Sequence, residues 1–460
     1  MKKGFVVPVQ EKIAYGMGDF AINIGYGAIG FYFVFFLTDV AGLPAEWAGY
    51  IFMIARFWDA ITDYLMGMIS DNTSTRWGRR RPYILFGCVP FGIAFALLWL
   101  VPFEADTALF IYYVCITILF NTAFTVVSIP YNSMLPELSQ NYDERTAISG
   151  YKMGFSFVGT LMAAAGIMLI VDVIFPGRGQ YLESFPVMGV AFGMIIAVAL
   201  LGTFAGTRER ITHDEAFVSE GFFTTLKSIM ALREFRLILG MFLFNMVGFD
   251  LIQVILIYFL KHVVQISEDY SFMIMAVPLV VAVIAAPVWV KIGEIMGKRR
   301  AYISAAFYMA LVFLLCLIAP VGNLPFVLAI AGLAGIGISA SQVIPFSIIP
   351  DVIEVDEYEN GIRREGAFYG ITMFLYKVAS AVAVAAASGL LGIFGYIESV
   401  GGAEAAVQPD SAVMAIRIIL GTGPGIAFLI SAVFVKKLPI TRERFDEIKR
   451  IVAERRGKRS

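Results

Sequence analysis

The hexapeptide GRRRPY, residues 78–83, recurs in the second half of the chain as GKRRAY, residues 297–302. A second pair follows, because IPYNSMLPEL at 129–138 recurs as IPFSIIPDVI at 344–353. The start positions differ by 219 residues for the first pair and by 215 for the second. Two matches with nearly one spacing indicate an internal duplication, so the sequence predicts two structurally similar halves.

The composition indicates what surrounds these halves. The 460-residue chain is 59% hydrophobic and only 15% charged, whereas a soluble domain is about 25% charged. Apolar runs that can cross a hydrocarbon core of about 30 Å recur from end to end, and they predict about twelve spanning helices. The predicted spans are residues 14–38, 46–70, 82–102, 107–136, 146–172, 187–206, 236–261, 270–292, 301–319, 324–350, 366–395 and 411–435. We therefore expect an all-α integral membrane protein with no sizeable soluble domain.

Polar segments divide the chain. The polar stretch at 207–235 is predicted to be a cytoplasmic linker. It would join an N-terminal six-helix bundle, residues 1–206, to a C-terminal six-helix bundle, residues 236–435. Residues 436–460 form a basic tail. Lys and Arg crowd alternate loops and both ends of the chain, and such a bias marks the cytoplasmic side. We expect a multi-pass protein of the cell (inner) membrane with both termini in the cytoplasm.

The segment RFWDAITDYLMG, residues 56–67, carries Arg56, Asp59 and Asp63 within an apolar helix. Their spacing puts all three on nearly one face. Ionised groups in a bilayer cost at least about 2.5 kcal/mol each, so they normally face the protein interior and have a partner. One negative charge exceeds the local positive charge, so either one aspartate carries a proton or a cation completes the site.

Neutral oxygen ligands for such a cation are available from Thr62 and Thr125, because hard cations prefer oxygen. Lys377, in a spanning helix of the second half, is a candidate charge partner. The alternative is a structural ion network among Arg56 and the two aspartates. Lys152 resembles Lys377 in position, although it lies closer to a charged loop and can also extend to the interface. Tyr26 can stack on a ligand or simply pack.

The loop DNTSTRWGRRRP joins the second and third predicted helices. We expect its basic cluster to gate the cytoplasmic side by pairing with acids at neighbouring helix ends, or else only to set topology. The basic cluster comprises Arg76, Arg79, Arg80 and Arg81. The candidate acids are Glu137, Asp143, Glu144, Asp351, Glu354, Asp356 and Glu357.

Several segments together resemble the glycoside-pentoside-hexuronide:cation symporters, the melibiose-permease-like family of the major facilitator superfamily. They are YGMGDFAINI, FFLTDVAGL, ARFWDAITDYLMG, DNTSTRWGRRRPYILFG, SIPYNSMLPEL, YDERTAISGYKMGFSFVG and PDVIEVDEYENGIRREGAFYG. The R-x-W-D-A-x-x-D segment and the basic loop after it are fairly specific in combination. The resemblance implies a major facilitator fold with two six-helix repeats and a substrate site between them near the bilayer midplane.

The resemblance also implies roles for residues. Asp59 and Asp63, helped by Thr62 and Thr125, would hold the coupling Na⁺, Li⁺ or H⁺, with Lys377 as a functional neighbour. The sugar positions differ from the melibiose carrier, because Asn23 and Ser128 replace two aspartates. In the same way Asn132 replaces a tryptophan and Lys152 an arginine. The predicted solute-binding residues are Asn23, Tyr26, Ser128, Asn132, Lys152 and Tyr376.

The predicted function is cation-coupled symport, with Na⁺ or H⁺, of a sugar, glycoside, hexuronide or similar small solute by alternating access. We expect a monomer that works in the lipid bilayer with a small solute and a monovalent cation, without a further cofactor and without nucleic acid. One alternative is a cation-dependent lysolipid carrier of the same fold. Another is an intramembrane aspartyl hydrolase, which normally needs two facing aspartates from separate helices.

Overall fold

The computed structural model describes residues 7–71, 73–139, 142–174, 181–210, 222–267, 270–360, 365–398 and 407–438. Residues 211–221 of the predicted linker and residues 439–460 of the predicted tail lie outside these ranges. The side chains of four candidate acids are likewise not described, namely Asp143, Asp351, Glu354 and Glu357. Each predicted span contains a helix, although α3 ends at Leu97 and the predicted span ran to 102, and all regular elements in the described ranges are helical.

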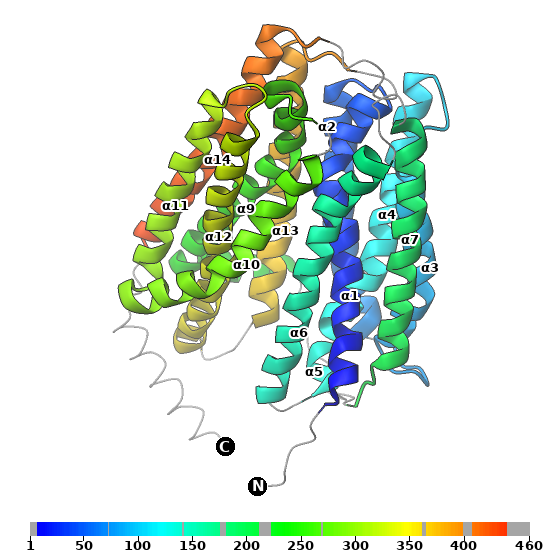
Figure 1. The fold of residues 1–460 in the computed structure, drawn as a ribbon. Helices are drawn as coiled ribbons and strands as arrows, with labels where there is room; N and C mark the ends of the chain where they lie inside the picture. The colour runs from blue at the N-terminus through cyan, green and yellow to red at the C-terminus, as the bar shows by residue number, and fades with distance from the viewer. Residues whose placement is uncertain are drawn as a thin grey trace. The chain divides into compact units, whose positions relative to one another are not determined.

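The first predicted half contains long helices interrupted by π-helical turns. Its elements are α1 (Val9–Ala28), η1 (Ile29–Phe33), η2 (Phe36–Val40), α2 (Ala45–Asp71), α3 (Arg81–Leu97), α4 (Asp106–Ser133), α5 (Leu135–Leu138), α6 (Tyr142–Leu161), η3 (Met162–Gly166), η4 (Leu169–Ile174) and α7 (Tyr181–Gly206). Within it, α1 packs against α6 and α7, while α2 packs against α4 (Figure 1).

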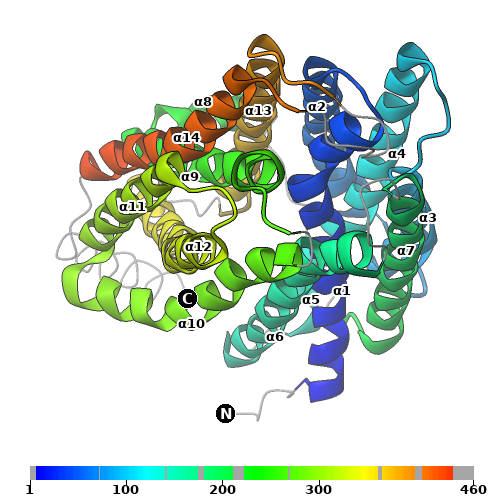
Figure 2. The same ribbon diagram turned by 45° about the horizontal axis from the view of Figure 1, so that its top comes forward.

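The second predicted half is built in the same way. It contains α8 (Phe222–Ala231), α9 (Arg233–Tyr258), η6 (Phe259–Val264), α10 (Ser271–Met296), α11 (Lys298–Leu314), η8 (Leu315–Ile318), α12 (Leu324–Asn360), α13 (Glu365–Ile393) and α14 (Asp410–Lys436). Helix α11 packs against α12, as Figure 2 shows. The short helix α8 lies inside the stretch predicted as linker, where the polar composition gave no helix signal.

Helix ends differ from the hydropathy prediction where polar residues continue a helix. Helix α12 runs to Asn360, past its predicted end at 350. Its last turns are acidic, and glutamate is a good helix former that a hydropathy window rejects. Nine helices in the described part of the chain are long and apolar enough to cross a membrane, and α3 is a shorter apolar helix. The chain is a multi-pass integral membrane protein.

The two copies of the basic repeat begin equivalent helices. Gly78 has a φ of +107° and precedes α3, and Gly297 has a φ of +83° directly before α11. Only glycine adopts such angles without steric cost. Each glycine turns the chain into a 17-residue helix, α3 or α11. The repeat seen in the sequence is therefore a repeat of local structure.

The chain divides into two compact units. The first comprises Met1–Ala216, Leu256–Ala276 and Val384–Ala415. The second comprises Phe217–Ile255, Val277–Ala383 and Ile416–Ser460. The bundle boundaries predicted at 206 and 236 stay a prediction.

Buried polar contacts explain why two later segments belong to the first unit. The hydroxyl of Tyr396 lies 2.6 and 2.7 Å from the two carboxylate oxygens of Asp39 and 3.0 Å from Nε2 of His262. Thr38 Oγ1 lies 2.7 Å from the hydroxyl of Tyr258. Burial, reinforced by Asp39, raises the pKa of Tyr396, which keeps the phenol neutral and able to donate. These contacts join the end of the first span to residues of the segments 256–276 and 384–415.

Candidate cation and solute site

Two carboxylates of α2 meet one hydroxyl of α4. Thr125 Oγ1 lies 3.1 Å from Asp59 Oδ1 and 3.0 Å from Asp63 Oδ1. Asp59 and Thr125 are each only 1% exposed. The four-residue spacing of the two aspartates brings both onto the α2 face that packs against α4. The structure therefore brings together three of the four predicted cation ligands.

The fourth predicted ligand points elsewhere in this structure. The hydroxyl of Thr62 lies 3.0 Å from the backbone carbonyl oxygen of Trp58 and 3.2 Å from that of Asp59, so it donates to an acceptor within its own helix. Such bonds to the preceding turn satisfy a hydroxyl inside its own helix. A role for Thr62 in cation binding stays a prediction.

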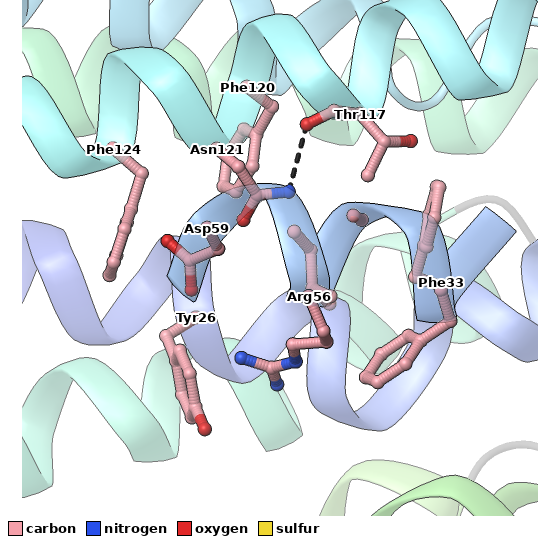
Figure 3. Close-up of a pocket in the computed structure, with 11 residues that line it drawn as sticks. Tyr26, Phe33, Arg56, Asp59, Thr117, Phe120, Asn121 and Phe124 are labelled. Atoms are coloured by element: carbon pink, nitrogen blue, oxygen red, sulfur yellow. Dashed lines mark hydrogen bonds between the residues drawn. The ribbon is translucent and has the colours of Figure 1, made fainter. Parts of the chain in front are cut away.

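Arg56 lies one turn before Asp59, on the wall of a pocket (Figure 3). Its guanidinium carbon is 4.9 Å from the ring centre of Tyr26 and 4.9 Å from that of Phe52. Cations over aromatic faces gain electrostatic attraction, most where water is excluded, and Arg56 is buried. Tyr26, predicted to bind solute, thus holds the arginine from one side.

The pocket has an empty volume of about 380 Å³, part of it open to solvent. Its lining is Tyr26, Ile29, Phe33, Phe52, Ala55, Arg56, Asp59, Thr117, Phe120, Asn121 and Phe124. Asn121 lies on the α4 side and donates to the carbonyl of Thr117 at 2.8 Å. Seven of the eleven lining residues are aromatic or aliphatic and four are polar or charged, a mixture typical of small-ligand pockets.

A second polar group lies on α1, α4 and α6. Lys152 donates to Asn132 Oδ1 at 2.6 Å, and its Nζ is 3.6 Å from Asp19 Oδ1. Asn23 donates to Asp19 Oδ2 at 3.2 Å. We call Asp19, Asn23, Asn132 and Lys152 the polar cluster. Ser128 is buried, and its carbonyl accepts from the Asn132 amide at 2.8 Å.

Asp19 was missed by the sequence reasoning. It belongs to YGMGDFAINI, which was used only for its resemblance. The signal was present, because an aspartate inside a spanning helix is by default a candidate functional residue. The structure puts this carboxylate among three residues that had been predicted to bind solute.

Lys377 and Tyr376 belong to the second unit. The Tyr376 hydroxyl donates to Asp250 Oδ1 at 3.0 Å, and Asp250 is buried. Asp250 is a second buried acid that the sequence reasoning did not select. The predicted partnership of Lys377 with the α2 carboxylates and the predicted contact of Tyr376 with solute stay predictions.

The basic loop is held by acids of its own unit. Arg80 is buried, and its Nε lies 3.3 Å from Glu137 Oε1. Burial raises the pKa of Glu137, against the opposing effect of Arg80. Arg81 donates to the carbonyl of Phe204 at 2.7 Å, and exposed Arg76 stacks on Trp77 with its guanidinium carbon 4.4 Å from the ring centre. A gating role for the loop stays a prediction.

Glu209 caps the start of α3 and was not foreseen. Its carboxylate accepts from the backbone N–H groups of Arg79, Arg80 and Arg81, at 2.6, 2.9 and 2.8 Å. These are donors that a helix N-terminus leaves without partners. A Cβ on Gly78 would lie 2.4 Å from Glu209 Oε2, so the glycine also makes room for this cap.

We expect Glu209→Ala to lower the free energy of unfolding by about 0.5–2 kcal/mol, the usual range for loss of a helix cap. The thermal unfolding midpoint of the purified chain in detergent measures it. Glu104→Ala, at an exposed position before α4, is the matched control. Equal midpoints for the two variants would contradict a capping role.

Residues 14–442 match the family of MFS/sugar transport proteins. The match spans most of the chain, which therefore belongs to this family. Its members are transporters rather than enzymes, which excludes the aspartyl hydrolase alternative.

Proteins that align with most of this chain are also named as transporters or symporters. The uncharacterized symporter sll1374 of Synechocystis sp. is 30% identical over 94% of this chain and 94% of its own. The sodium-dependent lysophosphatidylcholine symporter 1 of Xenopus tropicalis is 25% identical, covering 95% and 88%. The isoprimeverose transporter of Lactiplantibacillus pentosus is 25% identical, covering 85% and 82%.

A solved D-xylose-proton symporter has a similar fold, with a TM-score of 0.65 and 14% sequence identity over 94% of this chain and 97% of its own. At this identity the similarity concerns the fold alone. It confirms the major facilitator fold that the repeats and the resemblance predicted.

Proposed function

We propose that this protein is a cation-coupled symporter that carries a sugar, a glycoside or a similar small solute across the cell membrane by alternating access. Membership in a sugar-transport family supports solute transport, and the relatives named as symporters support cation coupling. The coupling ion is Na⁺, Li⁺ or H⁺, the transporting unit is the monomer, and both termini are cytoplasmic. The Lys/Arg distribution of the loops supports this orientation.

The observation that carries the proposal is the position of Thr125 between two carboxylates. A hydroxyl has one proton to donate, yet two carboxylate oxygens lie within 3.1 Å of Thr125 Oγ1. Only one of them can receive that proton, so the other faces a lone pair of the hydroxyl oxygen. A proton on one aspartate, or a cation that all three oxygens approach, removes this repulsion.

Helix α4 connects the two predicted sites. Thr125, Ser128 and Asn132 are spaced by three and then four residues, so they share one helix face. At one point on this face the α2 carboxylates contact Thr125, and two turns along it Lys152 contacts Asn132. Cation binding that fixes α2 against α4 also fixes the face that carries Asn132. Coupling then means that each ligand raises the affinity for the other by one common factor.

Uptake into proteoliposomes tests the proposal. The panel consists of sugars, glycosides, uronates and lysolipids, with Na⁺ and pH gradients imposed separately. We expect one sugar or glycoside to accumulate above its external concentration under one of the gradients, and to equilibrate when that gradient is collapsed. Equal uptake with and without either gradient would contradict cation coupling.

The second candidate is a lysolipid carrier, which the lysophosphatidylcholine symporter relative favours. The same panel separates the two candidates. Gradient-driven uptake of lysolipid, with none of any sugar or glycoside, would replace the proposed solute class and leave the cation coupling in place.

A further inference from the structure

The polar cluster brings a carboxylate to the ammonium group that is the obvious anchor for an acidic solute. Lys152 Nζ is 3.6 Å from Asp19 Oδ1, and Asp19 is 6% exposed. The Asp19 carboxylate also accepts from the Asn23 amide at 3.2 Å. Asp19 thus contacts both Asn23 and Lys152, and its charge opposes that of Lys152.

The charge of the cluster follows directly. Asp19 contributes −1 and Lys152 contributes +1, while the amides of Asn23 and Asn132 are neutral, so the sum is zero. A solute carboxylate that approaches Lys152 gains attraction from the ammonium and meets repulsion from Asp19. A solute ammonium is attracted by Asp19 and repelled by Lys152. The cluster therefore favours neither an anionic nor a cationic solute.

Uncharged hydroxyl groups fit this arrangement. Each hydroxyl donates one hydrogen bond and accepts others. The cluster offers donors on Lys152 and Asn132 together with acceptors on Asp19 and Asn23. The side chain of Lys152 is 23% exposed and Asn132 is exposed, whereas Asp19 is buried behind them. The two donor residues are therefore more accessible than the fixed negative charge of Asp19.

We infer that Asp19 is a specificity-determining residue, and that by neutralising Lys152 it selects uncharged, hydroxyl-rich glycosides over hexuronides and amino sugars. This inference rests on the proposed function, because it names the solute class of the same transport site.

A matched series of ligands tests it. Methyl glucoside, methyl glucuronide and the methyl glycoside of 6-amino-6-deoxyglucose differ only in the group at C6, which is neutral, anionic or cationic. Ligand-dependent thermal stabilisation of the full chain in detergent gives the affinities, because a ligand that binds only the folded state raises its stability. For the wild type we expect the neutral glycoside to bind at least about tenfold more tightly than either charged analogue.

Charge variants then move this preference in opposite directions. Asp19→Asn makes the cluster +1, so the affinity for the glucuronide relative to the glucoside rises about tenfold. Lys152→Gln makes it −1, so relative affinity shifts toward the amino glycoside. The double variant is neutral again and returns to a preference for the glucoside. Asp106→Asn, at an exposed carboxylate that begins α4, leaves the ratios unchanged.

The results separate this inference from the proposed function. A wild type that prefers the glucuronide, binds none of the three ligands, or keeps its ratios in both single variants overturns the inference. If Asp19→Asn does not fold, Lys152→Gln alone decides, because a structural role changes all three affinities by one factor and leaves their ratios constant. The expected ratios without gradient-driven uptake would instead overturn the symport proposal.

Discussion

Replacing Asp59 or Asp63 with asparagine is expected to abolish gradient-driven accumulation, so that the solute inside proteoliposomes only reaches its external concentration. Asparagine keeps the size of the side chain but removes the charge and the ability to bind and release a proton. The three-oxygen group around Thr125 then lacks one of its two anionic members. With that group incomplete, the cation gradient has no site through which to act.

Asp106→Asn is the control for this change, because Asp106 is exposed at the start of α4. It is expected to accumulate solute like the wild type. Both site variants are also checked for a folded chain by their thermal unfolding. Undiminished accumulation by a folded Asp59→Asn or Asp63→Asn protein, with unchanged cation dependence, would contradict the site.

Replacing Thr125 with valine is the second large change, and its effect falls on cation affinity. Valine keeps the branched shape and removes the oxygen that both carboxylates contact. A hydrogen bond to a charged group contributes about 1.5–3 kcal/mol, and every 1.4 kcal/mol corresponds to about a tenfold change in affinity. The cation concentration for half-maximal uptake should therefore rise about 10- to 100-fold.

Thr125→Ser keeps the hydroxyl and is expected to stay close to the wild type. The measurement is the initial uptake rate as a function of Na⁺ concentration, and separately of pH. Equal cation dependence of the valine and serine variants would show that the hydroxyl takes no part in cation binding.

The sequence was sufficient to predict the membrane-spanning helices, because a membrane span is recognised by the length of its apolar segment. The predicted spans all contain helices, and the repeat around Gly78 and Gly297 corresponds to a real structural repeat. Helix α8 and the end of α12 escaped prediction because they are polar or amphipathic, which hydropathy does not register.

The site was predictable where charge and spacing lie on one helix, and less so where helices meet. Asp59 and Asp63 stood out by their four-residue spacing in an apolar segment. Asp19 also lies inside a predicted span, which was a signal in itself, but its contact with Lys152 could not be predicted because the two residues are distant in sequence. Glu209 was missed for a similar reason, since it follows α7 yet caps α3.

The most direct test of the account is whether solute carries the cation with it. Proteoliposomes with equal Na⁺ and equal pH on both sides receive an inward gradient of the solute found in the uptake panel, and internal Na⁺ and pH are followed with indicators. Because coupling is reciprocal, solute flowing down its gradient is expected to bring Na⁺ or H⁺ inward, and Asp63→Asn is expected to bring none. Solute entry into wild-type vesicles without movement of either ion would contradict cation-coupled symport.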